Sequence, residues 1–353
     1  MEGAKFTKGN LKDSNGWIVV NDDATEVVLN LTAVNKKKTK ATDTISIAAL
    51  STINMSNATQ KGNIVLFDLT GSYMDGEKIS VKDKTLDLSL VDIKSSIGKV
   101  YVDDKKGLVY VELPDNMSSL SQPTIDLEAT ITGSGTKSML SIPLSFAQAF
   151  EFNYSGESGY YGDNGRNGGI NQNQRQNGSD ARSGTDGRNA RSLRLTIDLV
   201  KKDFSEKELL EVKIYVDGGL GNVMYVDPAS TASSVTVYTY GGSGGHGGRG
   251  GNGAAYVPYG SSSPARCGHG GNAGDGGNGG DGGNIHLIMT NKAKQYRNLF
   301  SLESKPGTAG QGGFGGNKNH TGSCNDVTTN GTKGRAGYHG REGIVSEEYV
   351  ENL

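Results

Sequence analysis

Polar and aromatic side chains that could recognise a ligand gather in three stretches of the chain, each of which interrupts a glycine-rich run. The first stretch is dense in amides, the second contains two tyrosines, and the third is basic and polar. Amides donate and accept hydrogen bonds, and tyrosine offers a rigid ring with a polar end, so these residues suit binding. The candidate receptor-binding residues are Asn171, Gln172, Asn173, Gln174, Arg175, Gln176, Tyr256, Tyr259, Lys318, Asn319 and His320.

The two cysteines fall in the second and third of these stretches. They lack the CxxC spacing of a zinc site, and two are too few for a disulfide scaffold. If the stretches lie side by side, Cys267 and Cys324 become candidates for a disulfide that restrains the loops in an oxidising environment. Two unrelated free thiols are the alternative.

No catalytic constellation is evident, so we expect a protein that is not an enzyme. Ser243 lies inside a uniform glycine repeat, which does not indicate the strand-to-helix turn of a nucleophile elbow. The sequence "GGNGGD" from Gly276 resembles the start of a calcium-binding repeat, but no second copy follows. We expect no metal and no cofactor. The histidines are scattered without ligand spacing at His246, His269, His286, His320 and His339.

The elements that must position the three stretches are runs with glycine at every third residue. This period is that of the polyproline II helix, which has 3 residues per turn and a rise of about 3.1 Å. A flexible linker needs no such register, and only 7 prolines accompany the 54 glycines, which disfavours collagen. The six runs lie near 156–168, 178–190, 241–253, 271–283, 310–316 and 331–343.

Glycine edges allow the backbones of neighbouring helices to touch and to exchange hydrogen bonds. Two glycine edges indicate an inner helix and one indicates an outer helix. By this rule 241–253 and 270–284 are interior, 156–168 and 331–343 are peripheral, and the third edge faces solvent or a tolerant gap.

The flanks of the runs predict a threefold repeat of strand, outgoing helix, tip loop, returning helix and strand. The strands would meet at one end and the tips at the other. The predicted base core contains Phe150, Phe152, Val235, Val237, Ile285, Leu287, Ile288, Leu299 and Phe300.

Residues 1–149 predict an all-β sandwich or barrel that serves attachment or assembly, and 150–353 predict the glycine-rich domain with its β-strand base. Expected strands include "EVVLNLTAV", "NIVLFDLTG" and "TLDLSL" (Thr85 to Leu90), with hairpins at "KVYVDDKKGLVYVEL" and "LLEVKIYVDGGLGNVMYVDP". A net charge of −2 makes nucleic acid a poor partner, and no apolar run is long enough to span a membrane. The N-terminus lacks a signal-like apolar region, so we expect either cytoplasmic synthesis or a form already cleaved.

The phased runs "GGSGGHGGRGGNG", "GGNAGDGGNGGDGGN" and "AGQGGFGGN" look like polyglycine II bundles over about 150–345. In this they resemble the glycine-rich adhesins at phage tail-fibre tips and the glycine-rich extracellular region of anaplastic lymphoma kinase. The first resemblance implies that distal loops bind a host-cell receptor. The strands between the runs and the β-rich first half have no counterpart in the phage adhesins.

We therefore expect a virion surface protein, an adhesin or decoration protein whose β domain joins other virion proteins and whose tips bind a protein or glycan receptor. The alternative is a bacterial cell-surface protein, such as a lipoprotein, that binds glycans or partners at the outer membrane.

Overall fold

The computed structural model of the chain describes residues 11–14, 17–20, 26–34, 40–48, 50–73, 76–103, 105–132, 134–169, 177–256, 266–318 and 328–353. Residues before 50 and those at 255, 256 and 266 are described by their backbone alone. The described chain is nearly all β, which confirms the predicted class. It forms two compact units, one of Met1–Asp115, Ser119–Ser145 and Asp203–Ser205, and the other of Asn116–Ser118, Phe146–Lys202 and Glu206–Leu353. No described helix is long and apolar enough to cross a membrane.

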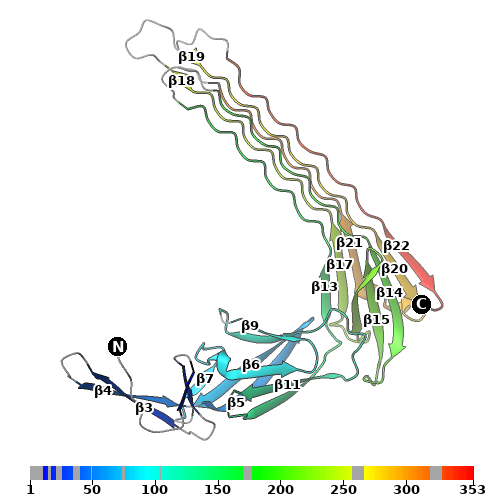
Figure 1. Cartoon of the computed structure of the whole chain (residues 1–353). Coiled ribbons are helices and arrows are strands. Elements are labelled where there is room, and N and C mark those ends of the chain that lie inside the picture. Colours follow the sequence, from blue (N-terminus) through cyan, green and yellow to red (C-terminus); the bar gives the residue numbers. More distant parts are fainter. Residues whose placement is uncertain are drawn as a thin grey trace. The chain divides into compact units, whose positions relative to one another are not determined.

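The first unit consists of antiparallel sheets (Figure 1). Two hairpins pair β1 with β2 and β3 with β4, a larger sheet has the order β5-β6-β10-β9 with β7 on β6, and a third sheet has the order β12-β11-β8. The strands are β1 (Leu11–Ser14), β2 (Trp17–Val20), β3 (Glu26–Val34), β4 (Lys40–Ala48), β5 (Leu50–Lys61), β6 (Ile64–Tyr73), β7 (Lys78–Ser80), β8 (Val91–Ser95), β9 (Lys99–Asp103), β10 (Leu108–Glu112), β11 (Thr124–Ile131) and β12 (Lys137–Pro143).

Alternation along β11 buries Ile125, Leu127, Ala129 and Ile131, as expected for a strand with one face on a core. The prediction of a strand at Thr85 to Leu90 is wrong. The chain there turns, and a 3-10 helix, η1 (Leu88–Leu90), follows. The Asp87 side chain accepts the Ser89 N–H, so a local cap competes with strand pairing.

The second unit has a base of two sheets whose strands belong to the expected repeat. The outgoing strands form the parallel sheet β13-β17-β21, and the returning strands form the parallel set β14-β20-β22, to which the hairpin β15–β16 is added beside β14. The strands are β13 (Ala149–Asn153), β14 (Leu193–Lys201), β15 (Glu208–Val216), β16 (Gly219–Val226), β17 (Ser234–Tyr240), β20 (Ile285–Thr290), β21 (Phe300–Lys305) and β22 (Val345–Val350), with η2 (Lys294–Leu299) before β21.

One hydrophobic core joins the two sheets of the base. Of the predicted core residues, Phe150, Val235, Val237, Ile285, Leu287 and Phe300 belong to it, and Phe152 and Leu299 pack against it partly buried. Ile288 was wrongly assigned to the core. Alternation along β20 turns Ile285, Leu287 and Met289 inward and leaves Ile288 on the other face.

Six glycine-rich segments without strand assignment run side by side between the base and the short hairpin of β18 (Ala255–Tyr256) and β19 (Arg266–Cys267) (Figure 1). We number them segment 1 (154–169), segment 2 (177–192), segment 3 (241–254), segment 4 (268–284), segment 5 (306–318) and segment 6 (328–344). Segments 1, 3 and 5 continue the outgoing strands, and segments 2, 4 and 6 lead into the returning strands.

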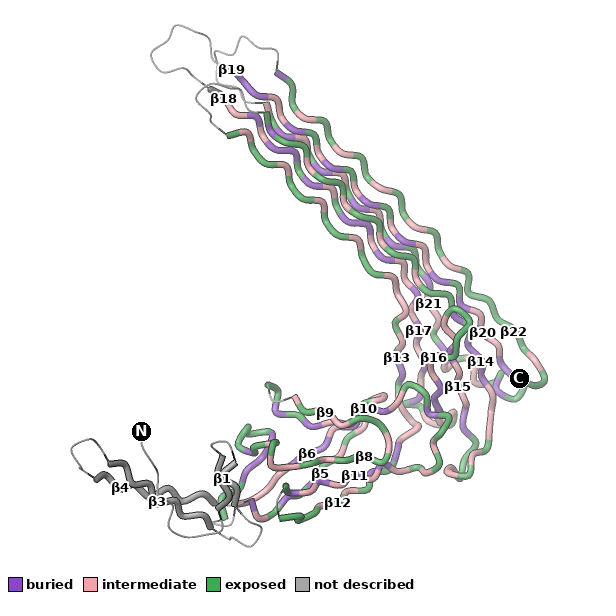
Figure 2. The backbone as a smooth tube through the Cα atoms, in the orientation of Figure 1, coloured by how far each residue is buried: buried purple, intermediate pink, exposed green. Residues whose placement is uncertain are grey.

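Backbone hydrogen bonds between these segments recur at every third residue. In segment 3, Gly242, Gly245, Gly248 and Gly251 donate to carbonyls of segment 2, and Gly244, Gly247 and Gly250 donate to segment 5. Segment 3 also accepts from segments 1 and 4, and segment 4 likewise bonds to segments 2, 3, 5 and 6. Segments 3 and 4 therefore lie inside, and Figure 2 shows their buried backbone between more exposed neighbours.

Close approach of the backbones requires the absence of a Cβ atom. A Cβ on Gly245 would overlap the carbonyl oxygen of Tyr160, and one on Gly248 would overlap that of Asp163. Because both contacts are with backbone, a side chain could be accommodated only by moving a neighbouring segment.

The base also contains a charged network between β14, β15 and β16. Glu211 accepts from Lys202 Nζ at 2.8 Å and from the Tyr225 hydroxyl at 3.2 Å, and Lys213 Nζ lies 2.7 Å from its other oxygen. Burial acts to raise the pKa of Glu211, but the hydrogen bonds and charges of the two lysines outweigh burial and hold the pKa below its ordinary value.

Replacing Gly248 by alanine should destabilise the second unit by about 1–3 kcal/mol, because the added methyl group overlaps the backbone of segment 1. Thermal unfolding and amide hydrogen exchange in segments 2–4 would measure this. Arg335→Ala, at an exposed position in segment 6, is the control and should change stability by less than about 0.5 kcal/mol. Equal stability of both variants would show that the backbone contact is not required.

Replacing Glu211 by glutamine should destabilise the base by about 1 kcal/mol at pH 7, because two ammonium groups lose their counter-ion. The depressed pKa means that the contribution of the carboxylate is complete above the unfolded value near 4.5 and is lost as the pH falls through the lower folded value. The difference between wild type and Glu211→Gln should therefore shrink in acid. Hydrogen exchange of the β14–β16 amides at several pH values measures it, and a difference independent of pH would contradict the assignment.

Candidate functional site

The described ends of the three tip stretches meet at the end of the bundle away from the base. Gly168 donates to Asn252, Gly178 to His269, Gly253 to Asn317 and Gly270 to Thr329, at 2.8 to 3.1 Å. The Gly268 N–H also donates to Ala254 at 2.9 Å and links segment 4 to segment 3, so that these bonds together connect all six segments immediately before or after the tips. We call these bonded segment ends the platform. All three tips thus extend from one hydrogen-bonded platform.

Most of the predicted site residues lie outside the described residues. These are Asn171, Gln172, Asn173, Gln174, Arg175, Gln176, Tyr259, Asn319, His320 and Cys324. Tyr256 is described by its backbone, which pairs with Arg266 in the β18–β19 hairpin. The N–H of Lys318 donates to Asn330 Oδ1 at 2.9 Å, which ties the two sides of the third tip together. Cys267 is fully buried at the end of β19.

The polar residues at the third position of each triplet have a structural role that the sequence analysis did not predict. On segment 2, Asp180, Asp186 and Asn189 accept the backbone N–H groups of Asn272, Asn278 and Asp281 on segment 4, at 2.6 to 2.7 Å. Those segment 4 side chains in turn accept N–H groups of segment 6 at 2.7 to 3.0 Å. We call these side chains caps, because each satisfies a backbone donor that the glycine contacts leave open.

The same arrangement covers the face formed by segments 1, 3 and 5. Asn164 accepts the Arg249 N–H, and Asn252 accepts the Asn317 N–H, both at 2.8 Å. His246 acts as a cap through Nδ1, which accepts the Gln311 N–H at 2.8 Å. Outside this face, His269 of segment 4 and His339 of segment 6 accept backbone N–H groups in the same way. A cap thus needs an acceptor atom close to the backbone, as in Asn, Asp, Ser or His.

Two positions on this face carry side chains that cannot act as caps, Tyr161 and Arg249. Neither residue was predicted from the sequence, because the third position of the triplet was expected only to face solvent or a tolerant gap. The signal was available as an interruption of the short polar residues that otherwise occupy these positions.

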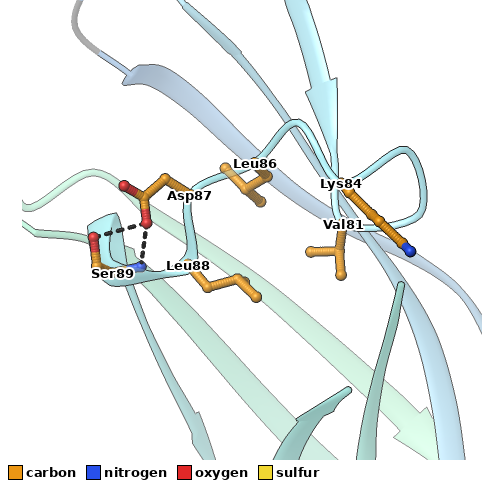
Figure 3. A pocket seen from close by; sticks show the side chains of 6 residues that line it. All are labelled: Val81, Lys84, Leu86, Asp87, Leu88 and Ser89. Atoms are coloured by element: carbon orange, nitrogen blue, oxygen red, sulfur yellow. Dashed lines mark hydrogen bonds between the residues drawn. The ribbon is translucent and has the colours of Figure 1, made fainter. Parts of the chain in front are cut away.

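The first unit has cavities, but the carboxylates that line them are already hydrogen-bonded within the protein. One cavity of about 270 Å³ is lined by Val81, Lys84, Leu86, Asp87, Leu88 and Ser89 (Figure 3). The Asp87 carboxylate accepts both the hydroxyl and the N–H of Ser89, and these bonds hold its pKa below the ordinary value. A larger hollow of about 560 Å³ includes Asp68, which accepts a hydrogen bond from Asn57 at 2.8 Å. Neither presents a convergent set of unengaged groups.

The disulfide between Cys267 and Cys324 stays a prediction. Mass spectrometry of peptides prepared without reduction, under thiol-blocking conditions, should recover the peptide that contains the Cys267–Cys324 link. We expect this because Cys267 lies beside the platform that also joins the two flanks of the third tip. Recovery of both cysteines as equally blocked thiols would contradict the pairing.

Comparison of the chain with protein-family models, with curated proteins and with solved structures gives no match. The function is therefore inferred from the residues of the chain itself.

Proposed function

We propose that this chain is a non-enzymatic virion surface protein, an adhesin or decoration protein that binds a host-cell receptor through the three tips. The six segments are, on this proposal, polyglycine II helices, and the first unit is a β-sandwich that attaches the protein to other virion components. The observation that carries the proposal is the platform at the distal end, where backbone hydrogen bonds join the flanks of all three tips.

A rigid scaffold that holds variable loops is a general device for recognition, because the loops can change while the framework keeps its hydrogen bonds. Here glycine N–H groups and backbone carbonyls make lateral contacts at every third residue, and the caps add further hydrogen bonds between the segments. The tips are rich in amides and tyrosine, which suit adaptable and rigid contacts respectively. The receptor is a protein or glycan at the cell surface.

Exchange of the tips tests the proposal. Each tip (170–176, 257–265 and 319–327) is replaced in turn by a glycine-serine loop of the same length, and binding of the purified protein to candidate bacterial cells is measured by fluorescence. Loss of binding in at least one exchanged protein with unchanged thermal unfolding is expected. The loop exchange in the second tip keeps Cys267 and that in the third removes Cys324, so Cys324→Ser serves as a matched control for loss of the proposed disulfide.

Undiminished binding in all three exchanged proteins would overturn the assignment to the tips. Binding to no bacterial cell, together with incorporation into a particle, would favour a decoration protein without receptor function.

A further inference from the structure

The face of segments 1, 3 and 5 contains a place where the capping rule is broken at two adjacent levels. Tyr161, His246 and Gln311 share one level, because Gly162 donates to His246 and Gly247 donates to Gln311. Asn164, Arg249 and Phe314 share the next level through the N–H groups of Gly165 and Gly250. We call these six residues the lateral patch.

At the other capping positions of segments 1, 3 and 4, and on the side of segment 2 that faces segment 4, the residue is Asn, Asp, Ser or His. On the side of segment 2 that faces segment 1, Arg182 and Arg188 stand in line with the caps Ser179 and Thr185, but they form ion pairs with Asp163 and Glu157.

Tyr161 stands where a cap would accept the His246 N–H, and Arg249 stands where one would accept the Phe314 N–H. Neither N–H has a hydrogen-bond acceptor among the described residues. The patch thus lacks two structural hydrogen bonds that asparagine would restore. Open N–H groups also occur, within the described chain, at Ser243 and Thr308, where the residue at the capping position is serine. Tyr161 and Arg249 depart from the capping residue types altogether, and such departures are expected at functional sites.

The charged groups of the patch indicate the sign of the charge on the ligand. The Arg249 guanidinium forms no ion pair or hydrogen bond with a described residue, and it is exposed. It offers a fork of N–H donors beside the two open backbone N–H groups, and Lys333 Nζ lies 5.4 Å from the centre of the Phe314 ring. The patch itself contains no carboxylate, so its complement is an anion.

The aromatic rings indicate what carries the negative charge. Tyr161 stacks on His246 with ring centres 5.2 Å apart and planes 12° apart, and it remains 75% exposed. Phe314 is 68% exposed on the next level. These rings are separated by Asn164, Arg249 and Gln311, so the patch alternates apolar surfaces with hydrogen-bonding groups rather than forming the continuous apolar centre of a protein interface. A sugar ring has matching surfaces, with apolar C–H groups on its faces and hydroxyls around its edge.

We propose that the lateral patch binds an anionic saccharide chain, with Arg249 and the open N–H groups of His246 and Phe314 contacting the acidic group and with Tyr161 and Phe314 contacting sugar rings. This site lies on the side of the bundle and is independent of the tips. It does not depend on the proposed receptor function.

The test uses Tyr161→Asn and Arg249→Asn, each of which replaces a ligand contact by a cap. Both variants should unfold at the same temperature as wild type or higher. Isothermal titration with oligogalacturonate, dextran sulfate and neutral dextran should show binding of at least one acidic chain by wild type, and weakening by about tenfold or more in each variant. Comparison of the two acidic probes distinguishes a carboxylate from a sulfate as the recognised group.

Matched controls come from Arg335 and Tyr338 of segment 6, whose side chains are exposed and accept no backbone N–H among the described residues. Tyr338→Asn and Arg335→Asn remove an exposed tyrosine and an exposed arginine there, and both should keep wild-type binding. The protein with all three tips exchanged should also keep it, which separates this site from the receptor function.

Several results would overturn the proposal. They are failure of wild type to bind either acidic chain, equal binding of neutral dextran, wild-type binding by both patch variants, and equal loss of binding in the segment 6 controls. A lower unfolding temperature of Tyr161→Asn would assign Tyr161 a structural role in place of the proposed one.

Discussion

Backbone hydrogen bonding without intervening side chains is the constraint on which the second unit depends. An N–H group can reach a carbonyl of a neighbouring segment only if no Cβ atom stands between the two chains, and Gly245 and Gly248 illustrate how little space remains. Segments 3 and 4 each form such hydrogen bonds with four neighbouring segments. A hydrophobic core is therefore needed only in the base, where side chains from two sheets meet.

The base sets the register of the whole bundle. β13 pairs with β17 at a separation of 85 residues, and the caps from segment 1 to segment 3 keep the same separation. The separations of 65, 92 and 60 residues between the other parallel strands also recur in the caps of the corresponding segments. The sheets thus continue into the glycine segments without a change of register. The packing of the base therefore determines which carbonyl each glycine N–H contacts, even at the distal end of the segments.

The sequence predicted the structure best where one residue type favours one kind of structure. Glycine at every third residue predicted the six runs, and alternation around β-branched residues predicted most strands. It failed where a local hydrogen bond decided the outcome, as at Asp87, whose cap on Ser89 replaces a strand by a turn and η1. The core assignment also failed for Ile288, which was placed with Ile285 and Leu287 although alternation along β20 puts it on the opposite face. The caps could not be derived from one segment, since Asn278 has its role only when segments 2 and 6 lie on either side of it.

Continuous register has a consequence for how such a molecule can change its reach. Inserting three residues into one segment alone would displace every later contact of that segment and would detach its tip from the platform. Inserting three residues into all six segments at one level would preserve every contact, and with the proposed polyglycine II geometry, which rises about 3.1 Å per residue, it would carry the tips about 9 Å farther. The bundle of six segments can therefore change length only in steps of three residues made in all six segments at once, so its possible lengths are discrete.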